Sequence, residues 1–382
     1  MVIAAVFIAA PAFAQAPAVT VGAAVSQTGA LAPLAADYRK ALLLWQDEIN
    51  AAGGLLGRRV ELRLADDGSD ARASGELYAG FIRDNADLLI GPFGSAATLM
   101  ASAQAERAQR VLINGAGPSA AVHKRSPRYL FQTTIPNSAY ADGVLELARA
   151  VGGERLLILS RGDQMVSEMA DAARARAEEQ GFTAELQTYR GGEDDFSPYV
   201  AKARAGDQGW IAFGEVRDAA AMIRTFRKLD YAPRLFFARS AADPQLIALV
   251  GQDAEFALAS QEYDAKWTTE GNDRFAAGFA AKWSAPPGYA AAQGYAAATV
   301  LAEAVRLTGA LDQAKLRDTL TRMEMPTVLG GYKVDPRNGE QRAARPAVVQ
   351  IQRGRPQVVW PVELQSATLQ PYPAWGERVV LK

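Results

Sequence analysis

The chain has 382 residues, of which 49% are hydrophobic and 22% are charged, and its formal net charge is −1 at pH 7. This length exceeds the usual size of one hydrophobic core and predicts two lobes of about 150 to 200 residues each, with the composition of an ordinary globular protein. A net charge close to zero provides no basic field for the phosphates of nucleic acid or for an anionic membrane surface, which argues against both of these function classes.

The first residues, MVIAAVFIAAPAFAQAPAVT, contain a short apolar run that ends with small residues at Ala12 and Ala14. About a dozen apolar residues are too few to cross a bilayer, for which roughly 20 are needed. The pattern predicts a secretory signal peptide over residues 1–14, cleaved after Ala14, although its usual basic beginning is missing. An apolar first strand is the alternative. Because the sequence contains no cysteine, disulfides, thiolate metal sites and an acylated-cysteine anchor are excluded, and we expect a soluble periplasmic protein without stable membrane insertion.

After this leader, short β-rich runs alternate with longer amphipathic segments, which is typical of βαβ units and parallel sheets. The first series predicts strands within residues 20–26, 60–67, 86–92, 110–117 and 128–134, and helices within residues 36–54, 71–85 and 96–109. The second series predicts strands within residues 155–161, 183–190, 209–216, 234–240 and 255–263, and helices within residues 167–181, 196–206, 218–230 and 243–251. Two such series predict two α/β lobes rather than one wide sheet.

The last part of the chain has a different pattern. An alanine-rich helix is predicted over residues 288–309 and another over 311–323. A hairpin-like segment follows over residues 330–361, with turn signals at Asp335–Gly339 and Arg353–Arg355. Residues 362–382 have no clear periodicity and receive no assignment.

Small and polar residues follow several of the predicted strands. In open parallel sheets, ligands bind beyond the carboxyl ends of the strands, and the stretch LLIGPFGSAATL, residues 88–99, has this position. Ser95 is expected to be the N-cap of the next helix, whose free amides and positive dipole end suit a carboxylate or another small anion. The next strand ends in INGAGPSAA, residues 113–121, and the first strand is followed by Ser26. Three loops therefore converge on one sheet edge, although a purely structural cap remains the alternative for Ser95.

The segments VGAAVSQTGALA, INAAGGLLGRRVELRLADDGSD, LLIGPFGSAAT, VLINGAGPS, YLFQTT and DFSPYVAKARAG follow one another in this order. Over these segments, from about Val19 to about Val359, the chain resembles the periplasmic solute-binding proteins of the branched-chain amino acid and amide group, which are the receptors of ABC importers. The run INAAGGLLGRRVEL followed by two aspartates is the most specific part. The resemblance implies an α/β fold of two Rossmann-like lobes with parallel sheets, joined by three crossovers, that closes on a small ligand.

The resemblance also implies how the chain is divided and which residues bind the ligand. The N-terminal lobe would comprise residues 17–137 and 264–328, and the C-terminal lobe residues 138–263 and 329–361, which leaves a tail of unknown structure over residues 362–382. In this family the loops matching Phe93–Thr98 and Asn114–Ser119 receive the ligand's carboxylate. With the loop after the first strand, the expected ligand-binding residues of the N-terminal lobe are Ser26, Phe93, Gly94, Ser95, Ala97, Thr98, Ala116 and Ser119.

The second lobe departs from the amino-acid-binding members of the family. Those members place an acidic residue for the ammonium group after the strand that matches residues 234–240, where this chain has Ser240 beside Arg239. They commonly have an aromatic residue where this chain has Met165. These departures leave open whether the ligand is an α-amino acid.

Three arginines follow strands of the second lobe, namely Arg161, Arg217 and Arg239, with Asp163 and Glu215 among them. One interpretation is a network of mutually paired surface charges. The other is that one of the arginines, or Glu215, contacts the ligand and sets its charge, and a guanidinium would favour a second carboxylate. The candidate ligand-binding residues of this lobe are Met165, Glu215, Arg217 and Ser240.

Motifs of catalysis and of metal binding are missing from the sequence. It has no glycine-rich dinucleotide loop, no P-loop lysine and no G-x-S-x-G, and His123 is its only histidine. The run DDGSD, residues 66–70, lacks the spacing and the closing glutamate of an EF-hand, so it is predicted to be a strand end with a turn and a cap. We therefore expect a monomeric receptor without enzyme activity, cofactor or metal, which delivers its ligand to ABC permease subunits. A ligand sensor of the same fold is the alternative, and an exported hydrolase that uses carboxylates is a more distant one.

Overall fold

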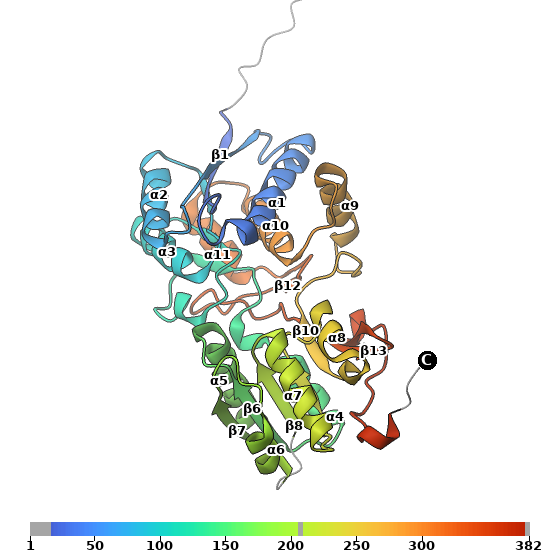
Figure 1. Ribbon diagram of the computed structural model, residues 1–382. Helices are drawn as coiled ribbons and strands as arrows, with labels where there is room; N and C mark the ends of the chain where they lie inside the picture. Colours follow the sequence, from blue (N-terminus) through green and yellow to red (C-terminus); the bar gives the residue numbers. More distant parts are fainter. Residues whose placement is uncertain (1–16, 205–208, 379–382) are drawn as a thin grey trace, which may run out of the picture.

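Two sheets, each covered by helices, form two lobes that lie one above the other in Figure 1. The computed structural model describes residues 17–204 and 209–378. The predicted leader over residues 1–14 lies outside the described residues. No helix within the described residues combines the length and the apolar character that crossing a membrane requires.

The N-terminal lobe is built on a parallel sheet with the strand order β2-β1-β3-β4-β5. Its strands are β1 (Val19–Ala24), β2 (Val60–Ala65), β3 (Leu88–Ile90), β4 (Leu112–Asn114) and β5 (Leu130–Gln132). Its helices are α1 (Ala32–Ala51), α2 (Ala71–Arg83), α3 (Ser95–Ala108), α9 (Asn272–Trp283), α10 (Tyr289–Thr308) and α11 (Gln313–Arg322), with a small hairpin of β11 (Met325–Thr327) and β12 (Gly330–Tyr332).

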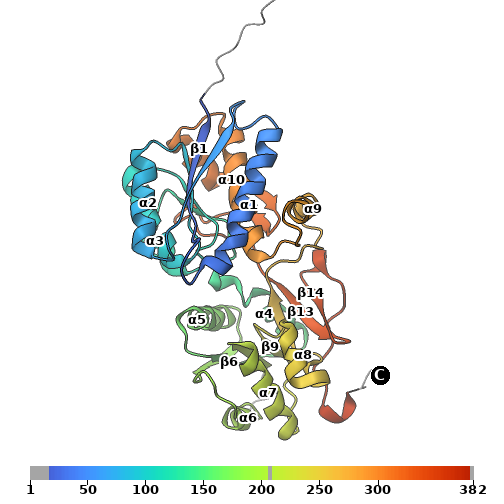
Figure 2. The same cartoon turned by 45° about the horizontal axis from the view of Figure 1, so that its top comes forward.

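Helices cover both faces of this sheet, which explains why the sequences of its strands are nearly continuous apolar runs. Val21 and Ile113 face a core with α1 and α10, whereas Leu89 and Leu112 face a smaller core with α2 and α3. In Figure 2, α2 and α3 lie on one side of β1, and α1 and α10 lie on the other.

The C-terminal lobe is built on a mixed sheet with the order β14-β13-β10-β9-β8-β6-β7, in which β13 runs antiparallel to β10 and β14 runs antiparallel to β13. Its strands are β6 (Arg155–Ser160), β7 (Thr183–Thr188), β8 (Gly209–Phe213), β9 (Phe236–Ala238), β10 (Leu258–Gln261), β13 (Ala347–Gln352) and β14 (Arg355–Trp360). Its helices are α4 (Asp142–Ala150), α5 (Gln164–Glu179), α6 (Ser197–Arg204), α7 (Val216–Lys228) and α8 (Pro244–Val250).

The chain passes between the lobes three times, between β5 and α4, between β10 and α9, and between β12 and β13. The predicted fold class, with two α/β lobes joined by three crossovers, is therefore confirmed. Both predicted turns within residues 330–361 form: Val334 and Gln341 make an antiparallel bridge across the turn at Asp335–Gly339, and β13 and β14 turn at Arg353 and Gly354, both with positive φ. The first turn lies on the third crossover, after β12, and the second joins two strands of the C-terminal sheet.

Two helices, α4 and α9, were not predicted from the sequence. Helix α9 contains Gly278, which lowers its intrinsic helix propensity. A Cβ atom at this position would lie 3.2 Å from Oε1 of Glu48 and 3.6 Å from a methyl group of Leu44, both on α1. The glycine lets α9 pack closely on α1, so tertiary contact stabilises a helix that its own sequence favours only weakly.

The unassigned tail is packed against the C-terminal lobe through residue 378. It forms two short 3-10 turns, η4 (Val362–Leu364) and η5 (Trp375–Glu377). The Trp375 indole is buried and its Nε1 donates a hydrogen bond to the Tyr231 carbonyl oxygen at 2.7 Å. The Arg378 guanidinium lies over the same ring, 3.6 Å from its centroid.

Candidate ligand-binding site

The ends of β1, β3 and β4 meet at one edge of the N-terminal sheet, because these strands are parallel neighbours. A β-bridge joins Phe93 to Ala116, and the Gly94 amide donates a hydrogen bond to the Ala116 carbonyl at 3.0 Å. A Cβ atom on Gly94 would lie 3.4 Å from Cδ1 of Leu31, in the loop after β1. The predicted convergence of three loops at this edge is observed.

Ser95 is not the N-cap of α3, contrary to the prediction. Gly94 takes that position with φ 97°, a conformation that glycine adopts without strain, so Ser95 is the first helical residue. The Ser95 hydroxyl instead accepts a hydrogen bond from the Ser119 amide at 3.1 Å and ties the two loops together. The amides of the first turn, from Ser95 to Ala97, have no acceptor within the helix and carry the positive end of its dipole. This turn remains suited to a carboxylate.

The loop after β4 is held by Asn114, whose role was not predicted from the sequence. Its side-chain amide donates to the Gly117 carbonyl at 2.8 Å, and its Oδ1 accepts from the Gly117 amide at 2.7 Å. A Cβ atom on Gly117 would lie 2.6 Å from the Thr98 hydroxyl, and one on Gly115 would lie 2.5 Å from the Tyr38 hydroxyl. The small residues of this loop are therefore required by packing as well as by access for a ligand.

Several predicted residues of this lobe have side chains that are already engaged. The buried Ser26 hydroxyl donates to Oδ1 of Asp67 at 2.6 Å, and the buried Thr98 hydroxyl donates to the Gly94 carbonyl at 2.9 Å. Ala97 is buried, and Phe93 packs edge-on against Tyr38. These side chains stabilise the loops, which leaves backbone amides as the groups available to a ligand.

The DDGSD run is a turn and a helix cap, as predicted. Asp70 caps α2 through the amides of Arg72 and Ala73. Asp66 accepts hydrogen bonds from the Gln27 and Gly68 amides, and these bonds lower the pKa of its carboxyl group to about 2. Within residues 17–204 and 209–378, no group of three or more histidine, aspartate or glutamate side chains is arranged to hold a metal ion.

Arg161 and Glu215, on the opposite edge, form a paired surface network. β6, β8 and β9 are neighbours in the C-terminal sheet, and their following loops share one edge. Arg161 forms ion pairs with Glu215 and, at 3.3 Å, with Asp163. Arg217 is exposed on the first turn of α7, and Met165 is exposed on the first turn of α5.

Arg239 has different surroundings, although its side chain is as partly buried as that of Arg161, with 26% exposed against 22%. Its Nη2 lies 3.4 Å from Oε1 of Glu262, and its guanidinium lies over the Tyr140 ring, 5.4 Å from the centroid. The adjacent Ser240 hydroxyl is buried and has no hydrogen-bond partner among the described residues. Tyr289 at the start of α10 bonds to the Thr134 hydroxyl at 3.1 Å, so residues of both lobes meet near Arg239.

The two lobes also touch through α5. Glu168 accepts hydrogen bonds from the Ala120 amide of the N-terminal lobe and, at 3.2 Å, from the Asn137 side chain of the first crossover. A cavity of about 780 Å³ lies beside this contact, between residues 119–126 and the start of α5. Of the predicted ligand-binding residues, Ser119 lines this cavity.

The sequence profile of a family described as periplasmic binding protein matches residues 18–356, which is most of the chain. The chain belongs to this family. The predicted resemblance is therefore confirmed.

Curated relatives of this periplasmic binding protein cover most of its length. An amino acid binding protein of Pseudomonas aeruginosa is 26% identical over 83% of this chain and 86% of its own. The leucine-, isoleucine-, valine-, threonine- and alanine-binding protein of the same organism is 22% identical over 81% of this chain and 83% of its own. Among solved structures, an ABC transporter substrate-binding protein from Desulfitobacterium hafniense has a TM-score of 0.74 and 22% identity, covering 89% of this chain and 99% of its own. These relatives are binding proteins by name, not enzymes.

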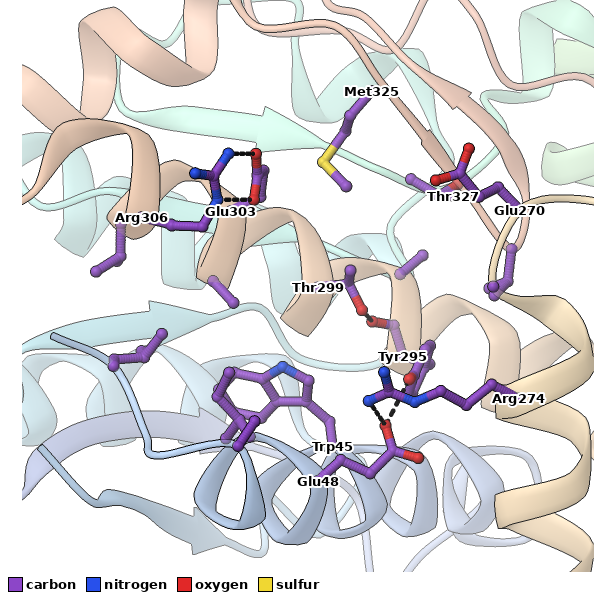
Figure 3. Close-up of a pocket in the computed structure, with 18 of the residues that line it drawn as sticks. Trp45, Glu48, Glu270, Arg274, Tyr295, Thr299, Glu303, Arg306, Met325 and Thr327 are labelled. Carbon is purple, nitrogen blue, oxygen red and sulfur yellow. Dashed lines mark hydrogen bonds and ion pairs between the residues drawn. The ribbon is translucent and has the colours of Figure 1, made fainter. Parts of the chain in front are cut away.

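A second cavity of this periplasmic binding protein, of about 560 Å³, lies within the N-terminal lobe. It is lined by α1, α10, the start of α9 and β11, with Trp45 and Met325 on its apolar walls (Figure 3). Glu48 at one end accepts hydrogen bonds from Arg274 and Tyr295. None of the predicted ligand-binding residues lines this cavity.

Proposed function

We propose that this periplasmic binding protein is an extracytoplasmic receptor that captures a small polar or carboxylate-bearing metabolite between its lobes and delivers it to the permease of an ABC importer. The observation that carries the proposal is the edge formed by the β1, β3 and β4 loops. There, the amides of the first turn of α3 lie beside the Phe93–Ala116 bridge, have no acceptor within the helix, and offer hydrogen-bond donors at one place. A helix N-terminus of this kind is suited to a carboxylate.

The names of the relatives support a ligand with a carboxylate group. Both Pseudomonas aeruginosa proteins are named for binding amino acids, and every amino acid carries a carboxylate. In this chain, the Ser95 hydroxyl and the Ala116 region belong to the loops that would receive it, with the amide of Gly94 holding their geometry. The opposite wall would come from the ends of β6, β8 and β9.

The two lobes are proposed to work as a hinged clamp. One lobe holds the ligand in the open form and the other makes its contacts on closure, so that binding shifts the population toward the closed form. Closure excludes water, which strengthens each hydrogen bond to the ligand. The permease would then recognise the closed form of a monomer, exported by the signal peptide over residues 1–14.

A ligand screen tests this proposal. The purified protein is heated with individual amino acids, amides, aliphatic and aromatic acids and dicarboxylates. We expect one chemical class to raise the melting temperature, because a ligand at a hundred times its Kd stabilises the folded state by about 2.7 kcal/mol. Uptake of the same compound should fall when the gene is deleted. A screen in which no compound shifts melting, together with unchanged uptake of all of them, would contradict the receptor function.

A further inference from the structure

Two adjacent polar atoms at the end of β9 are buried and lack partners. They are Nε of Arg239 and the hydroxyl oxygen of Ser240, and neither forms a hydrogen bond with another described residue. Buried polar groups are nearly always paired, because losing water without a replacement hydrogen bond is costly. Their position at the edge that faces the other lobe indicates that a ligand supplies the missing partner.

The Arg239 guanidinium keeps its charge although it is partly buried. Burial disfavours the charged form, but Tyr140, Glu262 and Tyr289 outweigh this effect, so its pKa stays above the ordinary value. A guanidinium has five donor N–H groups. The ion pair with Glu262, at 3.4 Å, is long and engages only one of its nitrogens. The buried Nε–H group, which has no partner among the described residues, therefore remains available to an anion.

Elements from both lobes surround this guanidinium. Tyr140 lies on the first crossover, Glu262 begins the second, and Tyr289 begins α10 of the N-terminal lobe. The Tyr289 hydroxyl lies 3.1 Å from that of Thr134, which also accepts a hydrogen bond from Gln293. Arg239 is therefore placed at the junction of the lobes and not on an outer surface.

Carboxylates near these strand ends are already engaged. Glu215 and Asp163 pair with Arg161. Glu168 accepts hydrogen bonds from the other lobe and the first crossover. Glu262 forms the ion pair with Arg239. An ammonium group entering here would lie beside a guanidinium, whereas a second anionic group would find unfilled donors.

We propose that the ligand is a dicarboxylate, with one carboxylate at the first turn of α3 and the other held by the Arg239 guanidinium and the Ser240 hydroxyl. This inference rests on the proposed function and specifies the ligand class. A planar guanidinium binds a carboxylate through two parallel hydrogen bonds, which fixes its orientation as well as its charge. The N-terminal lobe contributes neutral amides, so Arg239 is the residue that distinguishes a dicarboxylate from a monocarboxylate.

The test is isothermal titration of the full-length protein with succinate, glutarate and adipate, and with butyrate and leucine for comparison. We expect one of the dicarboxylates to bind most tightly. Arg239→Gln should weaken its binding about 100-fold, since a buried charge pair loses one partner. Arg239→Lys keeps the charge without the planar fork and should weaken binding about tenfold. The matched control is Arg155→Gln, an exposed arginine at the start of β6, at the opposite end of the sheet, which should leave binding unchanged.

The Glu262→Gln variant distinguishes a dicarboxylate ligand from a ligand that carries an ammonium group. It removes a competing carboxylate, so dicarboxylate binding should be retained or tightened. Loss of binding in Glu262→Gln but not in Arg239→Gln, or tightest binding of leucine, would overturn the inference while leaving the receptor function intact. Binding of no dicarboxylate would also overturn it. Unliganded melting curves show whether each variant folds, and Arg239→Lys carries the test if Arg239→Gln does not.

Discussion

Adding one methyl group at Gly115 should destabilise the protein, because this glycine lies where the β4 loop packs on α1. A Cβ atom at Gly115 would lie 2.5 Å from the Tyr38 hydroxyl and 2.9 Å from Cβ of Ala297. Both distances are below any normal carbon contact. Tyr38 is fully buried and donates a hydrogen bond to the Gly91 carbonyl at 3.0 Å, so its ring has no free space in which to move.

The expected cost of Gly115→Ala is the sum of two effects. Overpacking of a tight core costs about 1 to 3 kcal/mol. Displacement of the Tyr38 hydroxyl loses a hydrogen bond worth about 0.5 to 1.5 kcal/mol. We therefore expect the free energy of unfolding to fall by about 1.5 to 4.5 kcal/mol. Urea denaturation followed by circular dichroism measures this as a lower midpoint at an unchanged slope.

Two further variants decide whether the clash is the cause. In Tyr38→Phe the offending hydroxyl is absent, so Gly115→Ala should cost at least about 1 kcal/mol less in that background than in the wild type. Gly80→Ala, in the middle of α2 with no atom closer than 3.7 Å, should be neutral or stabilising by up to about 1 kcal/mol. Equal costs of Gly115→Ala in both backgrounds would refute the reasoning.

Three other variants probe the loops and the contact between the lobes. Burial lowers the pKa of His123 below 6.5, so the unfolded chain binds the proton first and stability is lost as pH falls below about 6.5. Urea titrations at pH 7.5 and 5.5 should show this loss, which is at most about 1.4 kcal/mol per pH unit, and the loss should be smaller in His123→Gln. Ser95→Ala leaves the Ser119 amide without its acceptor and should lower the free energy of unfolding by about 1 kcal/mol and weaken solute binding, and a variant with wild-type affinity would exclude this hydroxyl from the site. Glu168→Ala removes a contact between the lobes and should increase the radius of gyration of the unliganded protein in small-angle scattering, whereas Glu178→Ala, on the exposed face of the same helix, should not.

The alternation of strands and helices was predictable because parallel strands buried on both faces are short apolar runs. Strands β1 and β8 are buried along their length; β8 lies within its predicted segment, and β1 begins one residue before its own. The small helix α4 and the glycine-containing α9 were not predictable, since contact with the rest of the lobe stabilises them. Sequence periodicity also could not show that the tail ends against the C-terminal lobe, because single aromatic anchors such as Trp375 have no period.

Within the candidate site, the sequence predicted which loops meet but not what each side chain does. The N-cap of α3 is Gly94 and not Ser95. The positive φ of Gly94 goes with the hydrogen bond that its amide donates to Ala116 in a neighbouring loop. Arg161 and Arg239 have the same placement after their strands, yet one pairs with Glu215 and the other pairs with Glu262 and lies over Tyr140. Their difference depends on residues distant in the sequence, which a strand-end pattern does not contain.

The interleaving of the two lobes has a consequence for biogenesis. The Val111 amide is bonded to the side chain of Gln313 at 2.9 Å, and β10 is completed on one side by β13. Neither hydrophobic core can therefore be completed until most of the chain has been synthesised, and Trp375 joins the core of the C-terminal lobe last. Native packing of either lobe therefore depends on contacts between segments far apart in the sequence, and such contacts are slow to form.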